Sequence, residues 1–305
     1  MDRTIAVAPV TRLPSPSAVL ELFKPVTWFP PMWAFMCGVV SSGMPFQDRW
    51  LFLIAGIALT GPLVCATSQA VNDWFDRHVD AINEPNRPIP SGRIPGRWGL
   101  YIALIWTVLS VVVAALTGPW VLGATLLGLA LAWAYSAPPF RLKQSGVAGP
   151  FAVALSYEGL TWFTGAAVMA GALPHAPVLV LAAIYSFGAY GIMVLNDFKA
   201  VEGDRLLGLK SLPAELGVDS AARIACAVMA APQVIVVTLL VVAWDRPWHG
   251  LAVAVLLAVQ LGLMSRLLSD PKKFTPWYNT TGTTLYVIGM LVSAFAVRGI
   301  TGAGA

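Results

Sequence analysis

Charged residues are scarce in this sequence. Asp, Glu, Lys and Arg together make up 11% of its 305 residues, whereas an ordinary soluble domain carries about 25%. Apolar residues reach 57% of the chain, and the mean hydropathy is +0.73. Because so few polar residues could not cover a water-soluble surface, we expect an integral membrane protein.

Cysteine and histidine are also scarce, with three of each. Cys37, Cys65 and Cys226 fall inside apolar segments and form no CxxC spacing. This pattern indicates buried, reduced thiols and speaks against a disulfide framework or a zinc site. The first ~20 residues show no apolar run followed by a cleavage site, so we expect no signal peptide.

Long apolar segments are what the chain has in place of polar surface. Nine of them are long enough to cross a bilayer as helices, at residues 25–43, 50–71, 98–116, 119–136, 148–171, 177–195, 222–243, 248–266 and 281–298. The third and fourth are separated only by Thr-Gly-Pro, which predicts a tight hairpin. We expect an all-α membrane fold with one domain at 25–298, preceded by an N-terminal segment (1–24) and followed by a tail (299–305).

Lys and Arg are divided unequally between the two sets of connecting segments. If the N-terminus is cytoplasmic, all but three of the 19 Lys and Arg residues fall on the cytoplasmic side, the exceptions being Arg49, Arg246 and Arg298. This asymmetry predicts the orientation of the chain. It also accounts for the basic pI of about 9.1 through topology and lipid headgroups, without nucleic acid as a partner.

An acidic motif follows the second apolar segment, in the stretch NDWFDRHVDAINEPNRPIPSGRI at residues 72–94. Asp73, Asp76 and Asp80 are spaced so that a continuing helix places them on one face. Three stacked carboxylates repel each other, and a divalent cation relieves that repulsion. Together with Asn72 they form an oxygen-only ligand set that suits Mg²⁺ better than zinc. Three nearby prolines predict that the helix ends soon afterwards.

The same pattern returns after the sixth segment, in NDFKAVEGDRLLGLKSLP at residues 196–213. At a constant offset of 124 residues, Asn196-Asp197 matches Asn72-Asp73, and Asp204 matches Asp80. Asp76 has no acidic counterpart, because Ala200 stands there and Glu202 follows two residues later. Two acidic motifs on one side of the membrane indicate a helical repeat around a shared cavity that opens to the cytoplasm.

Basic and aromatic side chains accompany both motifs. Cations near the metal ligands suit an anion such as a diphosphate, although Arg and Lys at helix ends often only anchor a helix. The candidates for diphosphate binding are Arg77, Arg87, Tyr135, Arg141, Lys143 and Lys199.

Candidates for binding the second substrate lie inside or near the apolar segments. Glu158 is an intramembrane carboxyl group, which is either functional or held in a structural hydrogen bond to a neighbouring helix. Trp28, Trp33 and Trp162 form either part of an aromatic belt or flat walls for a planar ligand.

A Mg²⁺-diphosphate site that opens into an apolar membrane cavity predicts a substrate with an anionic head and a long hydrocarbon tail. Prenyl diphosphates fit this description, and transfer of the prenyl group to an acceptor requires a site that excludes water. A cation-coupled transporter is the alternative, but its acidic groups are expected near the middle of the membrane, whereas these cluster at one face. A phospholipid-type alcohol transferase would need a DG…AR…G…D…D run, which is absent.

These residues resemble the UbiA-type intramembrane prenyltransferases, and within that family the chlorophyll and bacteriochlorophyll synthase group. The resemblance covers roughly residues 20–298 and is carried by LFKPVTWFPPMWAF, the two acidic stretches and YSAPPFRLK; WFPPMWAFMCG and SYEGLTWFTGA favour the bacteriochlorophyll type. It implies a nine-helix bundle in which Asp73, Asp76, Asp80, Asp197 and Asp204 are catalytic, with the two asparagines as further metal ligands.

The resemblance also implies the reaction. A geranylgeranyl or phytyl group would pass from its diphosphate to the C17 propionate of bacteriochlorophyllide, in a bacterial inner or photosynthetic membrane and beside other pigment-pathway proteins. Chlorophyllide, a quinone precursor and haem remain alternative acceptors. Many family members carry Asp at the position of Ala200, which leaves the ligands of the second metal open.

Overall fold

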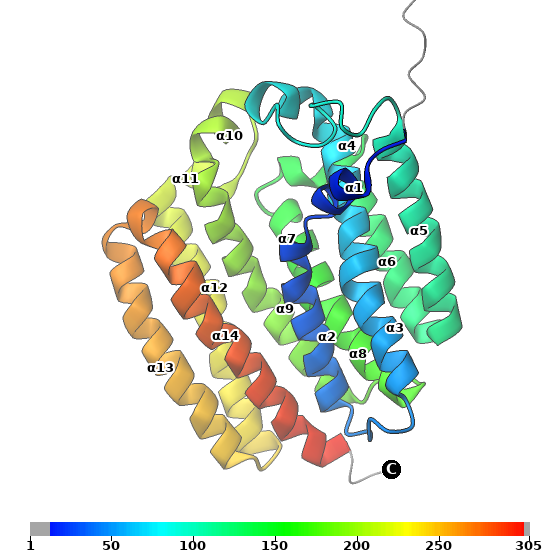
Figure 1. Ribbon diagram of the computed structural model, residues 1–305. Coiled ribbons are helices and arrows are strands. Elements are labelled where there is room, and N and C mark those ends of the chain that lie inside the picture. The colour runs from blue at the N-terminus through cyan, green and yellow to red at the C-terminus, as the bar shows by residue number, and fades with distance from the viewer. Residues whose placement is uncertain (1–12, 302–305) are drawn as a thin grey trace, which may run out of the picture.

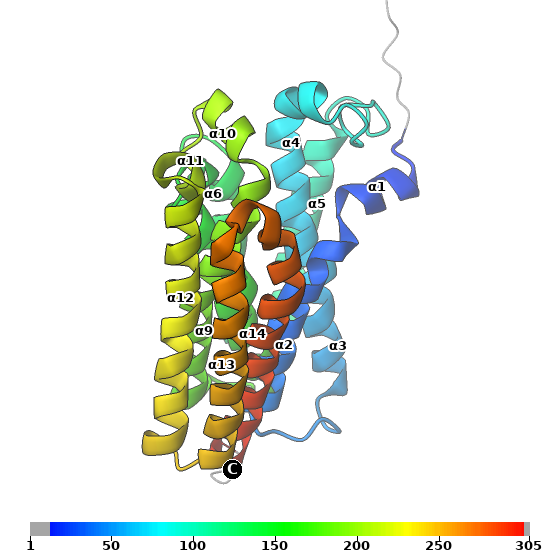
Figure 2. The ribbon, with the colours of Figure 1, turned by 90° about the vertical axis from the view of Figure 1, so that its left-hand side faces the viewer.

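The structure is a computed structural model that describes residues 13–301. Most of the predicted N-terminal segment, residues 1–12, and the end of the predicted tail, residues 302–305, lie outside the described part. Figures 1 and 2 show a bundle of long helices that run roughly parallel to one axis, with shorter helices at one end. The fold is all-α, as the composition predicts.

Helices occupy all nine segments that the sequence predicts as spans. The bundle consists of α2 (Phe29–Ser41), α3–η2–α4 (Trp50–Asn83), α5 (Trp98–Thr117), α6 (Pro119–Ser136), α7–η4–α8 (Ala148–Ala170), α9–η5 (Ala176–Lys199), α12–η6 (Val218–Ala243), α13 (Pro247–Ser269) and α14 (Pro271–Thr301). Short helices lie outside these runs: α1 (Pro16–Leu22), η1 (Pro25–Trp28), η3 (Leu142–Gln144), α10 (Val201–Leu207) and α11 (Leu212–Leu216).

Seven of the helices in residues 13–301 are long and apolar enough to cross a membrane. The other two are α2, which has 13 residues, and the helix that carries Glu158. The protein is therefore a multi-pass membrane protein. The three cysteines are free and buried, as expected.

Several helix ends follow directly from the sequence. Helix α4 ends at Asn83, two residues before Pro85, as the proline-rich stretch predicts. Gly118 separates α5 from α6 with a φ of 135°, a conformation that side chains disfavour, and this gives the predicted tight hairpin.

The ninth helix extends beyond the apolar segment that the sequence predicts. That segment, residues 281–298, lies inside α14, which begins at Pro271. The polar run that precedes residue 281 resembles a loop in composition, yet it continues the helix because Pro271 occupies the first turn, where no backbone donor is needed. This extension brings Asn279 onto the bundle.

Close contact between two helices fixes the centre of the bundle. A Cβ atom on Gly38 of α2 would lie 1.9 Å from the Trp162 carbonyl oxygen, and one on Gly165 of α8 would lie 2.0 Å from the Phe35 carbonyl oxygen. The backbones can approach this closely only because both residues lack a side chain.

The two acidic motifs lie at the same end of the bundle. The end of α4 and the short helices α10 and α11 are at the top of Figure 1, whereas the connection between α2 and α3 is at the bottom. The repeat therefore brings both motifs to one face, as its spacing predicts.

Candidate active site

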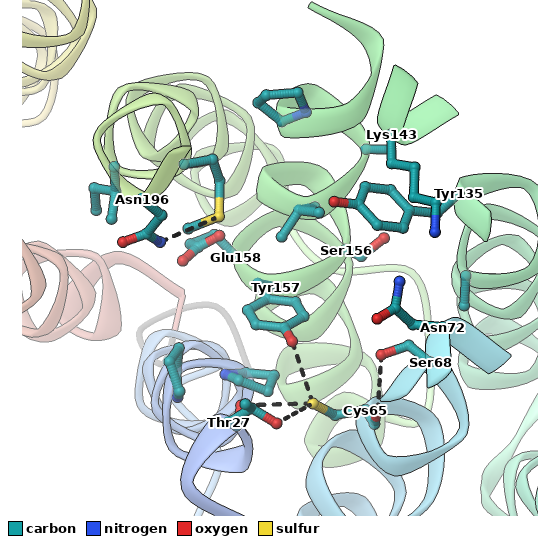
Figure 3. A pocket seen from close by; sticks show the side chains of 18 of the residues that line it. Thr27, Cys65, Ser68, Asn72, Tyr135, Lys143, Ser156, Tyr157, Glu158 and Asn196 are labelled. Carbon is teal, nitrogen blue, oxygen red and sulfur yellow. Dashed lines mark hydrogen bonds between the residues drawn. The ribbon is translucent and has the colours of Figure 1, made fainter. Parts of the chain in front are cut away.

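A cavity of about 800 Å³ lies among the bundle helices. Its lining includes residues from both acidic motifs, from the loop after α6, from the middle of α7–η4–α8 and from α14. Figure 3 shows Asn72 and Lys143 on one side of this space and Asn196 on the other. The acidic motifs, which are 124 residues apart in sequence, thus share a single cavity.

The first motif divides between the cavity and the protein interior. Asn72 and Asp76 line the cavity; the Asn72 amide donates to Asp76 Oδ2 (3.0 Å), and Lys143 forms an ion pair with the same carboxylate. Asp73 and Asp80 are buried outside the lining, and Arg87 contacts both of them, at 3.4 and 2.9 Å.

Lys24 gives Asp73 a second cation, at 2.7 Å. The sequence did not predict this contact, because Lys24 lies 49 residues before Asp73 in the chain. The Lys24 backbone is left-handed, with φ 46°. Asp73 therefore has two positively charged partners and 1% exposure.

The second motif contributes Asn196, Asp197, Lys199 and Asp204 to the cavity lining. Ser211 donates its hydroxyl hydrogen bond to Asp204 Oδ2 at 2.6 Å, which fixes that carboxylate. Ala200 also lines the cavity, so an aspartate at this position would face it. Glu202 does not replace that acid, because its side chain is exposed and pairs with Lys272 at 2.6 Å.

The candidate diphosphate-binding residues separate into two groups. Tyr135, Lys143 and Lys199 line the cavity. Burial lowers the pKa of the Lys143 ammonium, although its hydrogen bond to the Asp76 carboxylate opposes this shift. Arg87 lies outside the lining.

The remaining two arginines also lie outside the lining. Arg77 donates to the Trp74 carbonyl oxygen and covers the Trp74 ring at 4.1 Å. Arg141 stands at a positive φ of 38°, with its Nε buried.

The candidate acceptor-binding residues also separate. Trp33 and Glu158 line the cavity. Trp28 lies outside the lining and donates to the Phe23 carbonyl oxygen. The Trp162 side chain is fully buried, and its indole N–H donates to Ser41 Oγ. Its ring stacks on the Tyr185 ring with 5.7 Å between the ring centroids, so it is part of the helix packing.

Sequence reasoning missed Asn279. This residue lines the cavity from α14, and its amide donates to Asn196 Oδ1 at 3.2 Å. The polar run NTTGTT around it was the available signal, because polar residues within a membrane helix tend to face a cavity or another helix.

The donor set of the cavity suits a hard divalent cation. Carboxylate and amide oxygens of Asp76, Asp197, Asp204 and the two asparagines face one space, and Mg²⁺ prefers such ligands together with water. Within residues 13–301, no three His, Cys, Asp or Glu side chains already converge as a ligand cluster. Lys143 forms an ion pair with the Asp76 carboxylate. A bound cation would share the negative charge of this carboxylate with Lys143.

Comparison with known sequences identifies the family. The model of the UbiA prenyltransferase family matches residues 28–280. The bacteriochlorophyll synthase 33 kDa chain of Cereibacter sphaeroides is 58% identical over 94% of this chain and 95% of its own length. The chloroplastic chlorophyll synthase of Arabidopsis thaliana is 38% identical over 91% of this chain and 73% of its own.

Solved structures support the fold. A UbiA homologue from Archaeoglobus fulgidus, solved with GPP and Mg²⁺ bound, has a TM-score of 0.72 at 22% identity and covers 92% of this chain and 99% of its own. The resemblance that the acidic motifs predict is confirmed. This chain belongs to the UbiA prenyltransferase family and is a membrane prenyltransferase.

Proposed function

We propose that this protein transfers a geranylgeranyl or phytyl group from its diphosphate to the C17 propionate of bacteriochlorophyllide a. The observation that carries the proposal is the cavity, in which both acidic motifs and two lysines meet apolar walls. The names and high identity of the bacteriochlorophyll synthases support the acceptor, because the chlorophyll synthases are more distant.

The acid-bearing end of the cavity is the proposed diphosphate site. Mg²⁺ would be held by the cavity-facing residues Asn72, Asp76, Asn196, Asp197 and Asp204. Asp73 and Asp80 are buried behind Asn72 and Asp76. Bound Mg²⁺ supplies positive charge that stabilises the departing diphosphate. Lys143 and Lys199 donate hydrogen bonds to the same anion, and Tyr135 adds a hydroxyl group.

The apolar part of the cavity is the proposed prenyl site. Side chains such as Val64, Leu131, Ile192 and Met290 line it and exclude water from the reacting carbon. Exclusion of water is necessary because the allylic cation that forms as the diphosphate leaves would otherwise be hydrolysed.

The acceptor needs no strong base at this site. The propionate is already ionised at neutral pH, since carboxyl pKa values lie near ~4. One of its oxygens forms the new bond to the prenyl carbon, the bond from that carbon to the diphosphate oxygen breaks, and the diphosphate leaves with the electron pair. Atoms and charge balance without a further reactant.

The proposal includes topology. All nine helical segments cross the membrane as one domain at residues 25–298, the acid-bearing end and the N-terminus are cytoplasmic, and the membrane is the bacterial inner or intracytoplasmic photosynthetic membrane. The excess of Lys and Arg at the acid-bearing end supports this orientation. Other pigment-pathway proteins are the proposed partners.

The test is an assay with purified protein, geranylgeranyl diphosphate, Mg²⁺ and bacteriochlorophyllide a. We expect a product whose mass equals that of the prenyl ester, and we expect its formation to stop with EDTA and resume with added Mg²⁺. Ester formation that continues unchanged in EDTA would contradict the metal site.

A further inference from the structure

One wall of the cavity carries three buried polar atoms without partners. They are Glu158 Oε2, Asn279 Oδ1 and Thr283 Oγ1, none of which has a hydrogen-bond partner within residues 13–301. All three residues line the cavity, and Glu158 is only 5% exposed. A buried polar atom without a partner is costly, so these atoms indicate a ligand that completes them. Asn279 Oδ1 can only accept a hydrogen bond, whereas the Thr283 hydroxyl and a neutral Glu158 acid can each donate one.

The three residues come from neighbouring helices. Glu158 lies on the π-helical turn η4 (Leu155–Gly159), which contacts α9, and α9 also contacts α14. Asn279 and Thr283 are one turn apart on α14, and Asn279 is hydrogen-bonded to Asn196 of α9. Figure 3 shows Glu158 and Asn196 on the same side of the cavity, opposite Asn72.

Glu158 and Thr283 lie deeper than the diphosphate site, whereas Asn279 is hydrogen-bonded to Asn196 and borders the proposed metal ligands. Glu158 is ten residues beyond the start of its helix at Ala148, which is about 15 Å along the axis at 1.5 Å per residue. The two lysines that line the cavity follow α6 and α9 at the acid-bearing end. Within the described residues no Lys or Arg side chain is part of this wall, so the wall does not suit an anion and favours the neutral form of the Glu158 carboxyl group.

We propose that Glu158, as a neutral acid, and Thr283 form an acceptor-orienting wall that donates hydrogen bonds to a ring carbonyl on the rim of the tetrapyrrole. The inference rests on the proposed function and extends it to a specificity-determining site. Holding the rim of the planar acceptor on this wall leaves its propionate free to reach the acid-bearing end. Glu158 acts as a hydrogen-bonding group and carries no charge that the reaction requires.

The experiment measures acceptor binding apart from catalysis. The dissociation constant of bacteriochlorophyllide a is determined by quenching of tryptophan fluorescence, without Mg²⁺ and without prenyl diphosphate. Glu158→Leu removes the hydrogen-bonding group and is expected to raise this constant roughly tenfold. Glu158→Gln keeps a hydrogen-bonding group and is expected to stay within about threefold of the wild type.

Thr161→Val is the matched control. Thr161 lines the same cavity from the same helix, but its hydroxyl already donates to the carbonyl oxygens of Tyr157 and Glu158. This variant should bind the acceptor as the wild type does. The KM for geranylgeranyl diphosphate should be unchanged in all of these variants, because the wall is separate from the diphosphate site.

Thr283→Val tests the wall without altering a carboxyl group, and is expected to weaken acceptor binding roughly threefold. If Glu158→Leu fails to fold, the acceptor affinity of Thr283→Val alone tests the wall. If Glu158→Leu and Thr283→Val bind the acceptor with wild-type affinity, the inference is overturned. The proposed function still holds in that case, provided that the wild type forms the ester. Failure of the wild type to bind or esterify the tetrapyrrole overturns both.

Discussion

Asp73 and Asp76 are less than one helical turn apart, yet they have different partners. Asp76 faces the cavity and pairs with Lys143, whereas Asp73 is buried beside Lys24 and Arg87. The spacing predicts a shared face, but about 100° per residue leaves ~60° between these two side chains. The sequence could predict the acidic face but not this division, because the cations come from distant segments.

Asp76→Asn and Asp197→Asn should each reduce turnover by at least about 100-fold, because each removes a negative ligand oxygen from the proposed metal site. Thermal unfolding in detergent should change little for Asp197→Asn, which breaks no ion pair within the described residues, and should fall modestly for Asp76→Asn, which weakens the pair with Lys143. Activity as a function of Mg²⁺ concentration is the measurement. Wild-type turnover in both variants would show that the cavity-facing acids do not bind the metal.

Arg87→Met should destabilise the protein, because it leaves the buried Asp73 and Asp80 carboxylates with less compensation. We expect a loss of about 2 kcal/mol, less than for a fully buried pair because the Arg87 side chain is partly exposed. The midpoint of thermal unfolding measures the effect. Arg97→Met, at an exposed position nearby, is the control, and equal midpoints for the two variants would contradict the role of Arg87.

At the scale of helices, the sequence predicts where apolar segments lie but not how they bend. Pro62 and Gly61 lie inside the second segment, where a π-helical turn (Leu59–Cys65) accommodates the proline. A second π-helical turn carries Glu158. Both turns line the cavity, and no regular hydrophobic period marks them in the sequence, because the extra residue in each turn is accommodated by tertiary packing.

Gly165→Ala should destabilise the crossing of α2 and α8, since the new methyl group meets the backbone at Phe35. Overpacking of this kind costs about 1–3 kcal/mol, because backbone cannot move aside as a flexible side chain does. Gly123→Ala on α6 is the matched control, as its Cβ would meet nothing within 4 Å. Thermal unfolding should fall for Gly165→Ala only; an unchanged midpoint there would refute the close crossing.

At the scale of the whole molecule, the doubled acidic motif predicts a shared cavity, and the structure places both motifs on one. The sequence could not indicate that α14 completes the cavity, because Asn279 lies before the apolar segment and which face of that segment carries Thr283 depends on packing. A repeat can be recognised from the spacing of its residues in the sequence. Whether a helix outside the repeat lines the cavity depends on how the helices pack.

The proposed orientation predicts which loops reach the outside. Gln47 lies in the loop between α2 and α3, and Ser269 ends α13 near the acid-bearing end. Both residues are exposed, and each is replaced by cysteine in a separate variant. The native cysteines are buried and should give little background. In right-side-out vesicles a membrane-impermeant maleimide should label Gln47→Cys and spare Ser269→Cys, and the reverse pattern would invert the topology.

The most direct test of the account is a competition between acceptors. Purified protein receives Mg²⁺, geranylgeranyl diphosphate and equal amounts of bacteriochlorophyllide a, chlorophyllide a and 4-hydroxybenzoate, and the products are identified by chromatography and mass. The account predicts that the ester of bacteriochlorophyllide a dominates. A prenylated benzoate as the sole product would leave the prenyltransferase cavity intact and contradict the tetrapyrrole acceptor.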